Sequence, residues 1–122
     1  MSKKILIVDD EQDIVETLAF MLKQKGYECI MAYDGEEGLK LAKEEAPDLI
    51  ILDVMMPKIN GYKICRLLKF DSKYKDIPIV MVTARGQAQD IQIGEETGAD
   101  EYITKPFEFN ELFDTVKKYI GE

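Results

Sequence analysis

Acidic, hydroxyl and basic side chains directly follow four of the short hydrophobic segments in this sequence. Asp9 and Asp10 follow the first segment, Asp53 the third, Thr83 closes the fourth, and Lys105 comes after the fifth. Taken singly, an Asp at such a place most often caps a helix or a turn, and a single Lys or Thr has an ordinary structural explanation. Their joint occurrence after four segments points to a common site.

These side chains would meet if the hydrophobic segments formed a parallel sheet, because ligands bind beyond the carboxyl ends of parallel strands. Three carboxylates at one edge repel one another, which raises their pKa values unless a cation is present. Oxygen ligands of this kind suit Mg²⁺, which also accepts water and phosphate oxygens. We therefore expect a Mg²⁺ site, with Mn²⁺ as a substitute, and a lysine that can neutralise a bound phosphoryl group.

Alternating strands and helices are predicted along the whole chain. Segments rich in β-branched residues predict strands at 5–8, 29–32, 49–52, 77–82 and 102–104. Helical spacing of hydrophobic residues predicts helices at 14–26, 35–46, 61–70, 87–97 and 109–120, of which 87–97 is the least firmly anchored. Strands that are nearly continuous in hydrophobic residues indicate a parallel sheet covered on both faces, hence a doubly wound α/β fold.

Length and composition place limits on the class of protein. The 122 residues suit one domain, 1–122, and show no linker or low-complexity run. The longest hydrophobic runs have four or five residues, far short of the roughly 20 that a membrane helix needs, and the start lacks a signal peptide. A net charge of -8 argues against nucleic acid as a direct partner. We expect a cytoplasmic protein that binds other proteins.

The cysteine and histidine content limits the chemistry further. Cys29 and Cys65 lie far apart in hydrophobic segments without zinc-type spacing, so both are expected to be buried, reduced thiols. The sequence has no histidine, which removes Ser-His-Asp and Cys-His nucleophilic machinery. Any chemistry must use carboxylates, lysine and hydroxyl groups.

Five motifs occur in order along the chain: IVDDE at 7–11, LDVMMP at 52–57, NG at 60–61, VTA at 82–84 and GADEYITKPF at 98–107. This set resembles the receiver domains of two-component response regulators, and the resemblance extends from residue 4 to residue 119. It implies a flavodoxin-like fold of five strand–helix units with the strand order 2-1-3-4-5. Asn60 departs from the Asp found in many members, a mild change in a turn.

The resemblance also implies a role for each acidic residue. Asp53 would accept a phosphoryl group from a phosphohistidine on a sensor histidine kinase or a histidine phosphotransfer protein. Asp10, Asp53 and the backbone carbonyl of Met55 would bind the metal directly, and Asp9 would act partly through water. Such a transfer depends mainly on positioning and charge neutralisation.

Residues of the last two strands would bind the phosphoryl group and signal its presence. Lys105, Thr83 and Ala84 would contact the phosphoryl oxygens, and the Lys105-Pro106 peptide bond would be cis. Thr83 and Tyr102 would change position when the domain is phosphorylated. The alternative for Tyr102 is that it is an ordinary half-buried aromatic residue of the strand. The helix at 87–97, the last strand and the last helix would form the face that changes and binds a target protein.

Two other functions remain to be compared with this one. A phosphatase with an aspartyl-phosphate intermediate would need a second Asp two residues after the nucleophile, where this chain has Met55. A receiver-like module that has lost phosphotransfer would not be expected to retain the complete acidic, hydroxyl and lysine set. We therefore expect a signalling domain that catalyses its own phosphorylation and dephosphorylation without a separate substrate.

The state of the chain in solution is expected to be monomeric, with a phosphorylation-dependent dimer as the alternative. The sequence ends at Gly121-Glu122, just after the last predicted helix. This favours a single-domain protein, and a part of a longer regulator is the alternative.

Overall fold

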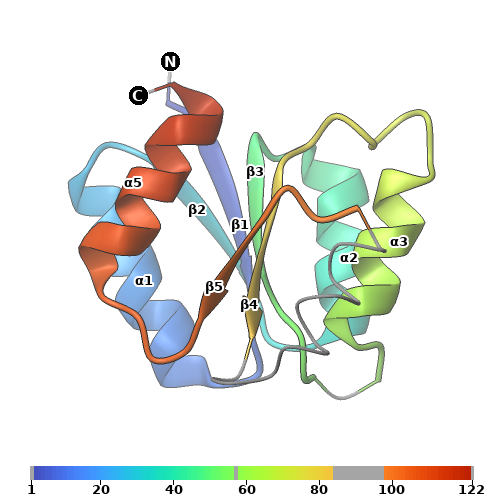
Figure 1. Ribbon diagram of the computed structural model, residues 1–122, viewed down its shortest axis with the longest axis horizontal. Coiled ribbons are helices and arrows are strands. Elements are labelled where there is room, and N and C mark those ends of the chain that lie inside the picture. The colour runs from blue at the N-terminus through green and yellow to red at the C-terminus, as the bar shows by residue number, and fades with distance from the viewer. Residues whose placement is uncertain (1, 57, 84–97, 122) are drawn as a thin grey trace.

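A five-stranded parallel sheet forms the centre of the computed structural model, which describes residues 2–56, 58–83 and 98–121. The strand order is β2-β1-β3-β4-β5, and all strands point toward the lower end of Figure 1. The strands are β1 Lys4–Val8, β2 Glu28–Ala32, β3 Leu49–Asp53, β4 Ile79–Thr83 and β5 Glu101–Thr104. The predicted doubly wound α/β class and the strand order implied by the resemblance are therefore confirmed.

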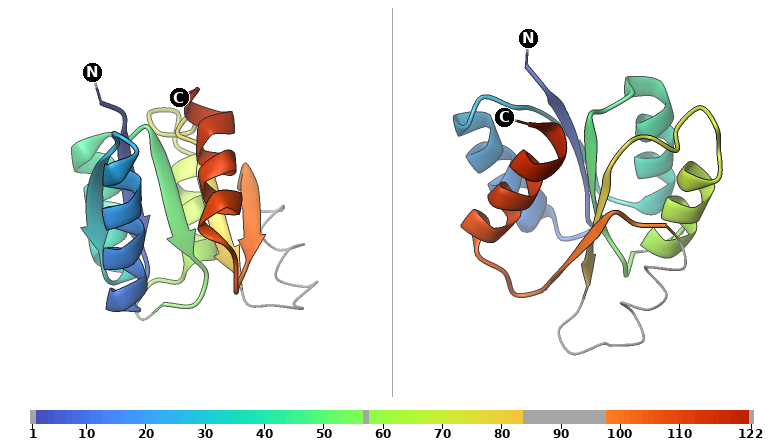
Figure 2. Two further views of the ribbon diagram at one scale, coloured as in Figure 1. Left: turned by 90° about the vertical axis from the view of Figure 1, so that its left-hand side faces the viewer. Right: turned by 45° about the horizontal axis from the view of Figure 1, so that its top comes forward.

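Helices cover both faces of the sheet, as Figures 1 and 2 show. In the described part of the chain they are α1 Gln12–Gln24, α2 Gly35–Glu45, α3 Gly61–Lys69 and α5 Phe109–Ile120. Helices α1 and α5 lie on one face, and α2 and α3 lie on the other. The helix predicted at 87–97 lies outside the described residues.

Side-chain caps explain where two of these helices begin. The Asp34 carboxylate accepts a hydrogen bond from the backbone N–H of Glu37 at 2.8 Å, and the Asn60 side chain accepts one from Lys63 at 3.0 Å. Such caps satisfy backbone donors that have no partner within the helix. Asn60 is therefore well suited to start α3 directly after the loop that leaves β3.

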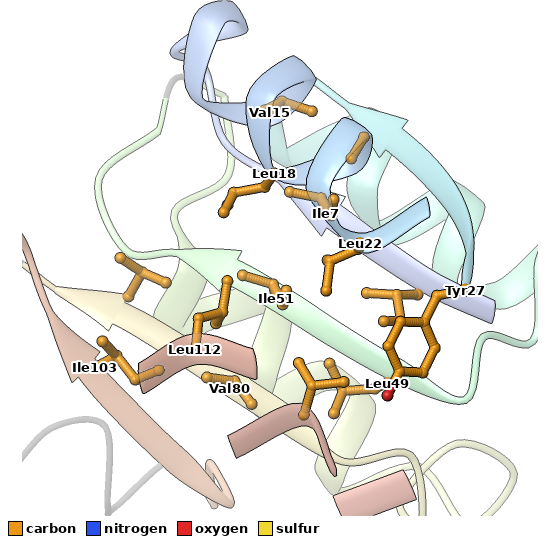
Figure 3. Close-up of a cluster of buried hydrophobic side chains, with 14 residues drawn as sticks. Ile7, Val15, Leu18, Leu22, Tyr27, Leu49, Ile51, Val80, Ile103 and Leu112 are labelled. Atoms are coloured by element: carbon orange, nitrogen blue, oxygen red, sulfur yellow. The ribbon is translucent and has the colours of Figure 1, made fainter. Parts of the chain in front are cut away.

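Each strand contributes to two hydrophobic cores because alternate side chains point to opposite faces. Ile7 and Ile51 belong to the core beneath α1 and α5, where Leu18, Leu22 and Leu112 meet them (Figure 3). Their neighbours along β1 and β3 belong to the core beneath α2 and α3, together with Met81 of β4: Leu6, Val8, Ile50 and Leu52. The unbroken hydrophobic strands of the sequence follow from this burial on both sides.

Two expectations from the sequence need correction. Strand β4 begins at Ile79 and not at residue 77, because the N–H of Ile77 closes a turn onto the carbonyl of Tyr74 and Pro78 has no N–H to donate. Cys65 is buried as expected, but Cys29 is only half-buried. It lies on the edge strand β2, where one side of the backbone has no neighbouring strand.

Both cysteines are free thiols. The Cys29 thiol lies 3.7 Å from the carbonyl oxygen of Ala19, and burial raises its pKa to about 11. It therefore remains protonated at neutral pH, as expected for an inert structural cysteine.

None of the helices in the described ranges has the length and hydrophobicity needed to cross a membrane.

Helix α3 begins in direct contact with the backbone at the end of β3. The N–H of Gly61 donates to the carbonyl of Val54 at 2.8 Å. A Cβ atom at Gly61 would collide with the carbonyl oxygen of Asp53. The lack of a side chain at this position is what allows α3 to approach the strand end so closely.

We predict that Gly61→Ala lowers the free energy of unfolding by about 1–3 kcal/mol, because the added methyl group must push α3 away from a rigid backbone. Urea unfolding measures the change. Lys63→Ala, at an exposed position on the same helix, is the matched control and should stay within about 0.5 kcal/mol of the wild type. Equal stability of Gly61→Ala and wild type would contradict the close approach.

Candidate functional site

Three carboxylates converge at the carboxyl ends of the two central strands β1 and β3. Asp9 and Asp10 follow β1, and Asp53 is the last residue of β3. Val8 and Leu52 are register partners, which places Asp9 level with Asp53 on the neighbouring strand. One oxygen atom from each of the three carboxylates lies within 4.8 Å of the other two. The sheet register thus creates the cluster that the sequence predicted.

Lys105, which follows the edge strand β5, brings a positive charge to this cluster. Its Nζ lies 3.2 Å from Oδ2 of Asp9 and 3.3 Å from Oδ1 of Asp53. Neighbouring strands lie about 4.8 Å apart, so β5 is about 10 Å from β3, with β4 between them. A long side chain is needed to cross this distance. The Lys105-Pro106 peptide bond is cis, as the resemblance implied.

Glu11 is a third partner of Lys105 that sequence reasoning did not assign. Its Oε1 lies 3.2 Å from the Lys105 Nζ, although 59% of the Glu11 side chain is exposed. The backbone N–H of Glu11 also donates to Oδ1 of Asp9 at 2.9 Å. The available signal was its position directly after Asp9 and Asp10, but only the fold shows that it faces the lysine.

Burial and crowding change the acid–base properties of the site. Burial, together with the nearby charges of Asp9 and Asp10, raises the pKa of Asp53 to about 6 despite the opposing effect of Lys105. Burial likewise raises the pKa of Asp9. Burial alone would lower the pKa of Lys105, but Asp53, Asp9 and Glu11 outweigh it and raise that pKa. Lys105 is therefore a permanent cation at neutral pH.

This donor set fits a hard divalent cation. The three candidate ligands offer only carboxylate oxygens, the type that Mg²⁺ and Mn²⁺ accept. Asp9 and Asp53 are buried while Asp10 is exposed, so the group is open to solvent on one side. The pKa of Asp53 is raised first by burial and then by the charges of Asp9 and Asp10, and a cation bound here would oppose both effects because it favours the ionised carboxylate.

For the remaining predicted site residues, the structure describes the side chain of some and only the backbone, or neither, of others. Thr83 ends β4 in register with Thr104, so its backbone lies at the same sheet edge, but its side chain and Ala84 lie outside the described part of the structure. Met55 lies two residues beyond β3 with a side chain that is 72% exposed. Tyr102 is half-buried and packs against the core beneath α2 and α3.

A hydrophobic groove of about 710 Å³ opens beside the charged cluster. It lies between α1 and the segment that joins β5 to α5, and Glu11 and Lys105 form part of its wall. Its hydrophobic lining consists of Ile14, Leu18, Met21, Pro106, Phe107 and Phe109. The groove therefore places hydrophobic side chains next to Lys105, which contacts Asp9 and Asp53.

Comparisons with known proteins agree with this fold. A family model described as the response regulator receiver domain matches residues 5–117. The chain is 49% identical over 117 residues to the alkaline phosphatase synthesis transcriptional regulatory protein PhoP of Bacillus subtilis (strain 168). This match includes 96% of the present chain and 48% of PhoP, so the chain spans about half the length of that relative.

Solved structures give the same result. A crystal structure from Chloroflexus aurantiacus J-10-fl, described as a response regulator, has a TM-score of 0.94 and 38% identity, with 100% of both chains covered. The chemotaxis response regulator CheY4 of Vibrio cholerae has a TM-score of 0.90 and 34% identity, over 98% of this chain and 99% of CheY4. The chain belongs to the receiver domains of two-component response regulators.

The raised pKa of Asp53 predicts a pH-dependent stability. Its value is about 6 in the folded protein against an ordinary value of 3.8. The folded state thus holds this proton more tightly, and the stability contributed by Asp53 is lost as the pH rises between these two values. At neutral pH and without metal, Asp53→Asn should therefore raise the free energy of unfolding by about 1–3 kcal/mol.

Urea unfolding in EDTA across a pH series tests this effect. The gap between variant and wild type should shrink as the pH falls from about 6 to the ordinary Asp value of 3.8, and it should be lost below that value. A variant that is less stable than the wild type at neutral pH, or a gap that does not change with pH, would show that repulsion and burial do not dominate at Asp53.

Proposed function

We propose that the chain accepts a phosphoryl group on Asp53 from a phosphohistidine of a sensor histidine kinase or a histidine phosphotransfer protein. The observation that carries the proposal is the position of Asp53: a buried carboxylate with Asp9 at its side and the Lys105 Nζ at 3.3 Å. Receiver domains are signalling domains, and they interact with histidine kinases or phosphotransfer proteins and with downstream targets. The proposal adds which residue receives the group.

The protein's own residues supply positioning and charge for an in-line transfer. A pKa of about 6 leaves most Asp53 side chains ionised at neutral pH, and hence nucleophilic. Lys105 already lies among Asp9, Glu11 and Asp53, so its ammonium group can turn to a phosphoryl oxygen without leaving the site. Fixed charges of this kind stabilise charge that develops during transfer at little cost in reorganisation.

The acidic cluster would hold Mg²⁺ through Asp10, Asp53 and the Met55 carbonyl, with Asp9 acting partly through water, and Mn²⁺ could substitute. When bound, the ion supplies positive charge that offsets the carboxylates and the incoming phosphoryl oxygens. The contact of the Lys105 Nζ with Oδ1 of Asp53 at 3.3 Å helps to orient the Asp53 carboxylate, and Asp9 holds the same ammonium group by accepting a hydrogen bond from it at 3.2 Å.

Phosphorylation would be reported by β5, α5 and residues 87–97. Thr83, Ala84 and Lys105 would bind the phosphoryl oxygens, and Thr83 and Tyr102 would shift with them. In this structure Tyr102 packs against the core beneath α2 and α3. A movement of Tyr102 on phosphorylation would change the equilibrium between two arrangements of this face. A target protein would bind the altered face, and the chain would be a monomer that can dimerise when phosphorylated.

Acetyl phosphate tests the phosphoacceptor role directly, because it can donate without a protein partner. Incubation with Mg²⁺ should add one phosphoryl group to the intact mass of the wild type. Asp53→Asn should gain none, and EDTA should abolish the addition because the carboxylates then repel the donor. An adduct of equal yield on Asp53→Asn, or none on the wild type, would refute the assignment of Asp53.

The groove beside Lys105 is the surface that supports docking of the phosphohistidine donor. It opens at the same edge as Asp53 and is lined mainly by hydrophobic side chains. A protein donor seated there would bring its histidine toward the acceptor, and such positioning accounts for much of the rate of group transfer.

We predict that Ile14→Ala, in the wall of this groove, slows phosphotransfer from a phosphorylated histidine kinase by about tenfold, as expected when a buried contact is truncated. Transfer from acetyl phosphate should be unchanged, because it needs no docking. Phe20→Ala is the control, since Phe20 lies on the same helix with 64% exposure and does not line the groove. If transfer slowed equally with both donors, the substitution would be acting on the reaction at Asp53 and not on docking of the kinase.

A further inference from the structure

The outward face of α3 differs from that of an ordinary solvent-exposed helix. The helix has two stripes, each with the i, i+3, i+4, i+7 spacing that places residues on one side. The inner stripe is buried against the sheet and consists of Gly61, Ile64, Cys65 and Leu68. The outer stripe is exposed and consists of Lys63, Arg66, Leu67 and the C-cap residue Phe70. Two cations and two large hydrophobic side chains therefore share the outer face.

The hydrophobic residues of the outer face are unusually accessible. Phe70 is 75% exposed and Leu67 is 43% exposed. In the described part of the chain four large hydrophobic side chains are exposed, and these are two of them. Single exposed hydrophobic residues are common on protein surfaces, whereas adjacent ones with a polar rim are typical of binding sites. A shallow groove of about 340 Å³ between Asn60 and Leu67 runs along the same helix.

The charge of this region is opposite to that of the protein. Residues 58–75 contain six of the sixteen Lys and Arg residues but one of the twenty-four Asp and Glu residues, while the whole chain has a net charge of -8. Within the described ranges, no carboxylate lies at salt-bridge distance from Lys63 or Arg66. By contrast, Lys69 on the inner side pairs with Asp100 at 2.6 Å.

We infer that the outer face of α3 is a second docking surface, which binds an acidic segment of a partner protein that carries large hydrophobic side chains. Lys63 and Arg66 would pair with the partner's carboxylates, and Leu67 and Phe70 would contact its hydrophobic side chains. Charge complementarity of this kind sets specificity and association rate, while the desolvated hydrophobic contacts carry most of the affinity.

The neighbouring helix favours a short acidic segment over an extended polyanion such as nucleic acid or a membrane. Helix α2 packs beside α3 and exposes four carboxylates and two lysines, so its surface carries a net negative charge: Glu36, Glu37, Glu44 and Glu45 against Lys40 and Lys43. Charges interact over about 8 Å at physiological ionic strength, so a polyanion that reached past α3 would be repelled by these carboxylates. A peptide that lies along one helix can avoid them.

This surface is separate from the groove proposed for the phosphohistidine donor. That groove lies between α1 and the start of α5. These two helices lie on the opposite face of the sheet from α3 (Figure 1). A partner on α3 could therefore bind at the same time as a donor. Helix α3 begins in contact with the backbone carbonyl of Asp53. Binding of a partner on α3 and phosphorylation of Asp53 would therefore take place on neighbouring parts of the backbone.

Selection from a display library of short random peptides on the immobilised full chain tests the inference. Wild type should enrich sequences that combine Asp or Glu with Phe, Leu or Trp, and Lys63→Glu/Arg66→Glu should not. A synthetic peptide of the enriched sequence should bind the charge-reversed variant at least about tenfold more weakly. It should also bind Phe70→Ala more weakly, and its affinity for wild type should fall as salt is raised.

Matched surface variants complete the test. Lys40→Glu and Phe20→Ala change the same residue types at exposed positions on α2 and α1 and should bind the peptide as wild type does. All variants should still accept phosphate from acetyl phosphate, which separates this test from that of the phosphoacceptor role. The inference is overturned if no enrichment depends on α3, or if enriched peptides lack acidic residues. It is also overturned if a single-stranded oligonucleotide or phosphatidylserine vesicles bind in place of the peptides with the same dependence on α3.

Discussion

Repulsion between carboxylates at one edge of the sheet is the interaction on which the rest of this structure depends. Asp9 and Asp53 are buried side by side with Asp10 close to both, an arrangement that is unfavourable without compensating positive charge. Lys105 provides part of that charge from β5, two strands away from β3. The repulsion that makes this group of carboxylates unfavourable by itself is also what makes it suited to a hard divalent cation.

The packing of the helices against the sheet determines which parts of the molecule contact the edge that carries the carboxylates. Gly61 places the start of α3 against the Asp53 carbonyl, and the connection from β5 to α5 begins at Lys105 itself. Two surfaces of different chemistry extend from these points. The groove between α1 and α5 is mainly hydrophobic, whereas the outer face of α3 combines cations with Leu67 and Phe70. The helices that carry these two surfaces lie on opposite faces of the sheet.

The hydrophobic pattern predicted the strands and the convergence of the acidic residues, because a buried parallel strand needs hydrophobic side chains on both faces and leaves polar ones at its end. The order of the strands came from the family resemblance and not from this pattern. Sequence reasoning was less successful where a residue's environment depends on neighbours elsewhere in the chain. Cys29 was expected to be buried, but an edge strand leaves it half-buried. The start of β4 was placed too early, since the turn at Ile77 depends on a hydrogen bond to Tyr74. The contact of Glu11 with Lys105 was not foreseen.

The amino-acid sequence by itself determined the class of fold, the family and the set of side chains at the strand ends. Hydrophobic pattern and motif order are local properties, and they can be read without coordinates. Only the tertiary structure decided how these side chains interact. The distances from Lys105 to Asp9, Asp53 and Glu11, and the rise in the pKa of Asp53, depend on strand register and burial. The same holds for the outer face of α3, because exposure is a property of the packed molecule: Phe70 and Leu68 are both hydrophobic, and only packing against the sheet buries Leu68 and leaves Phe70 in solvent.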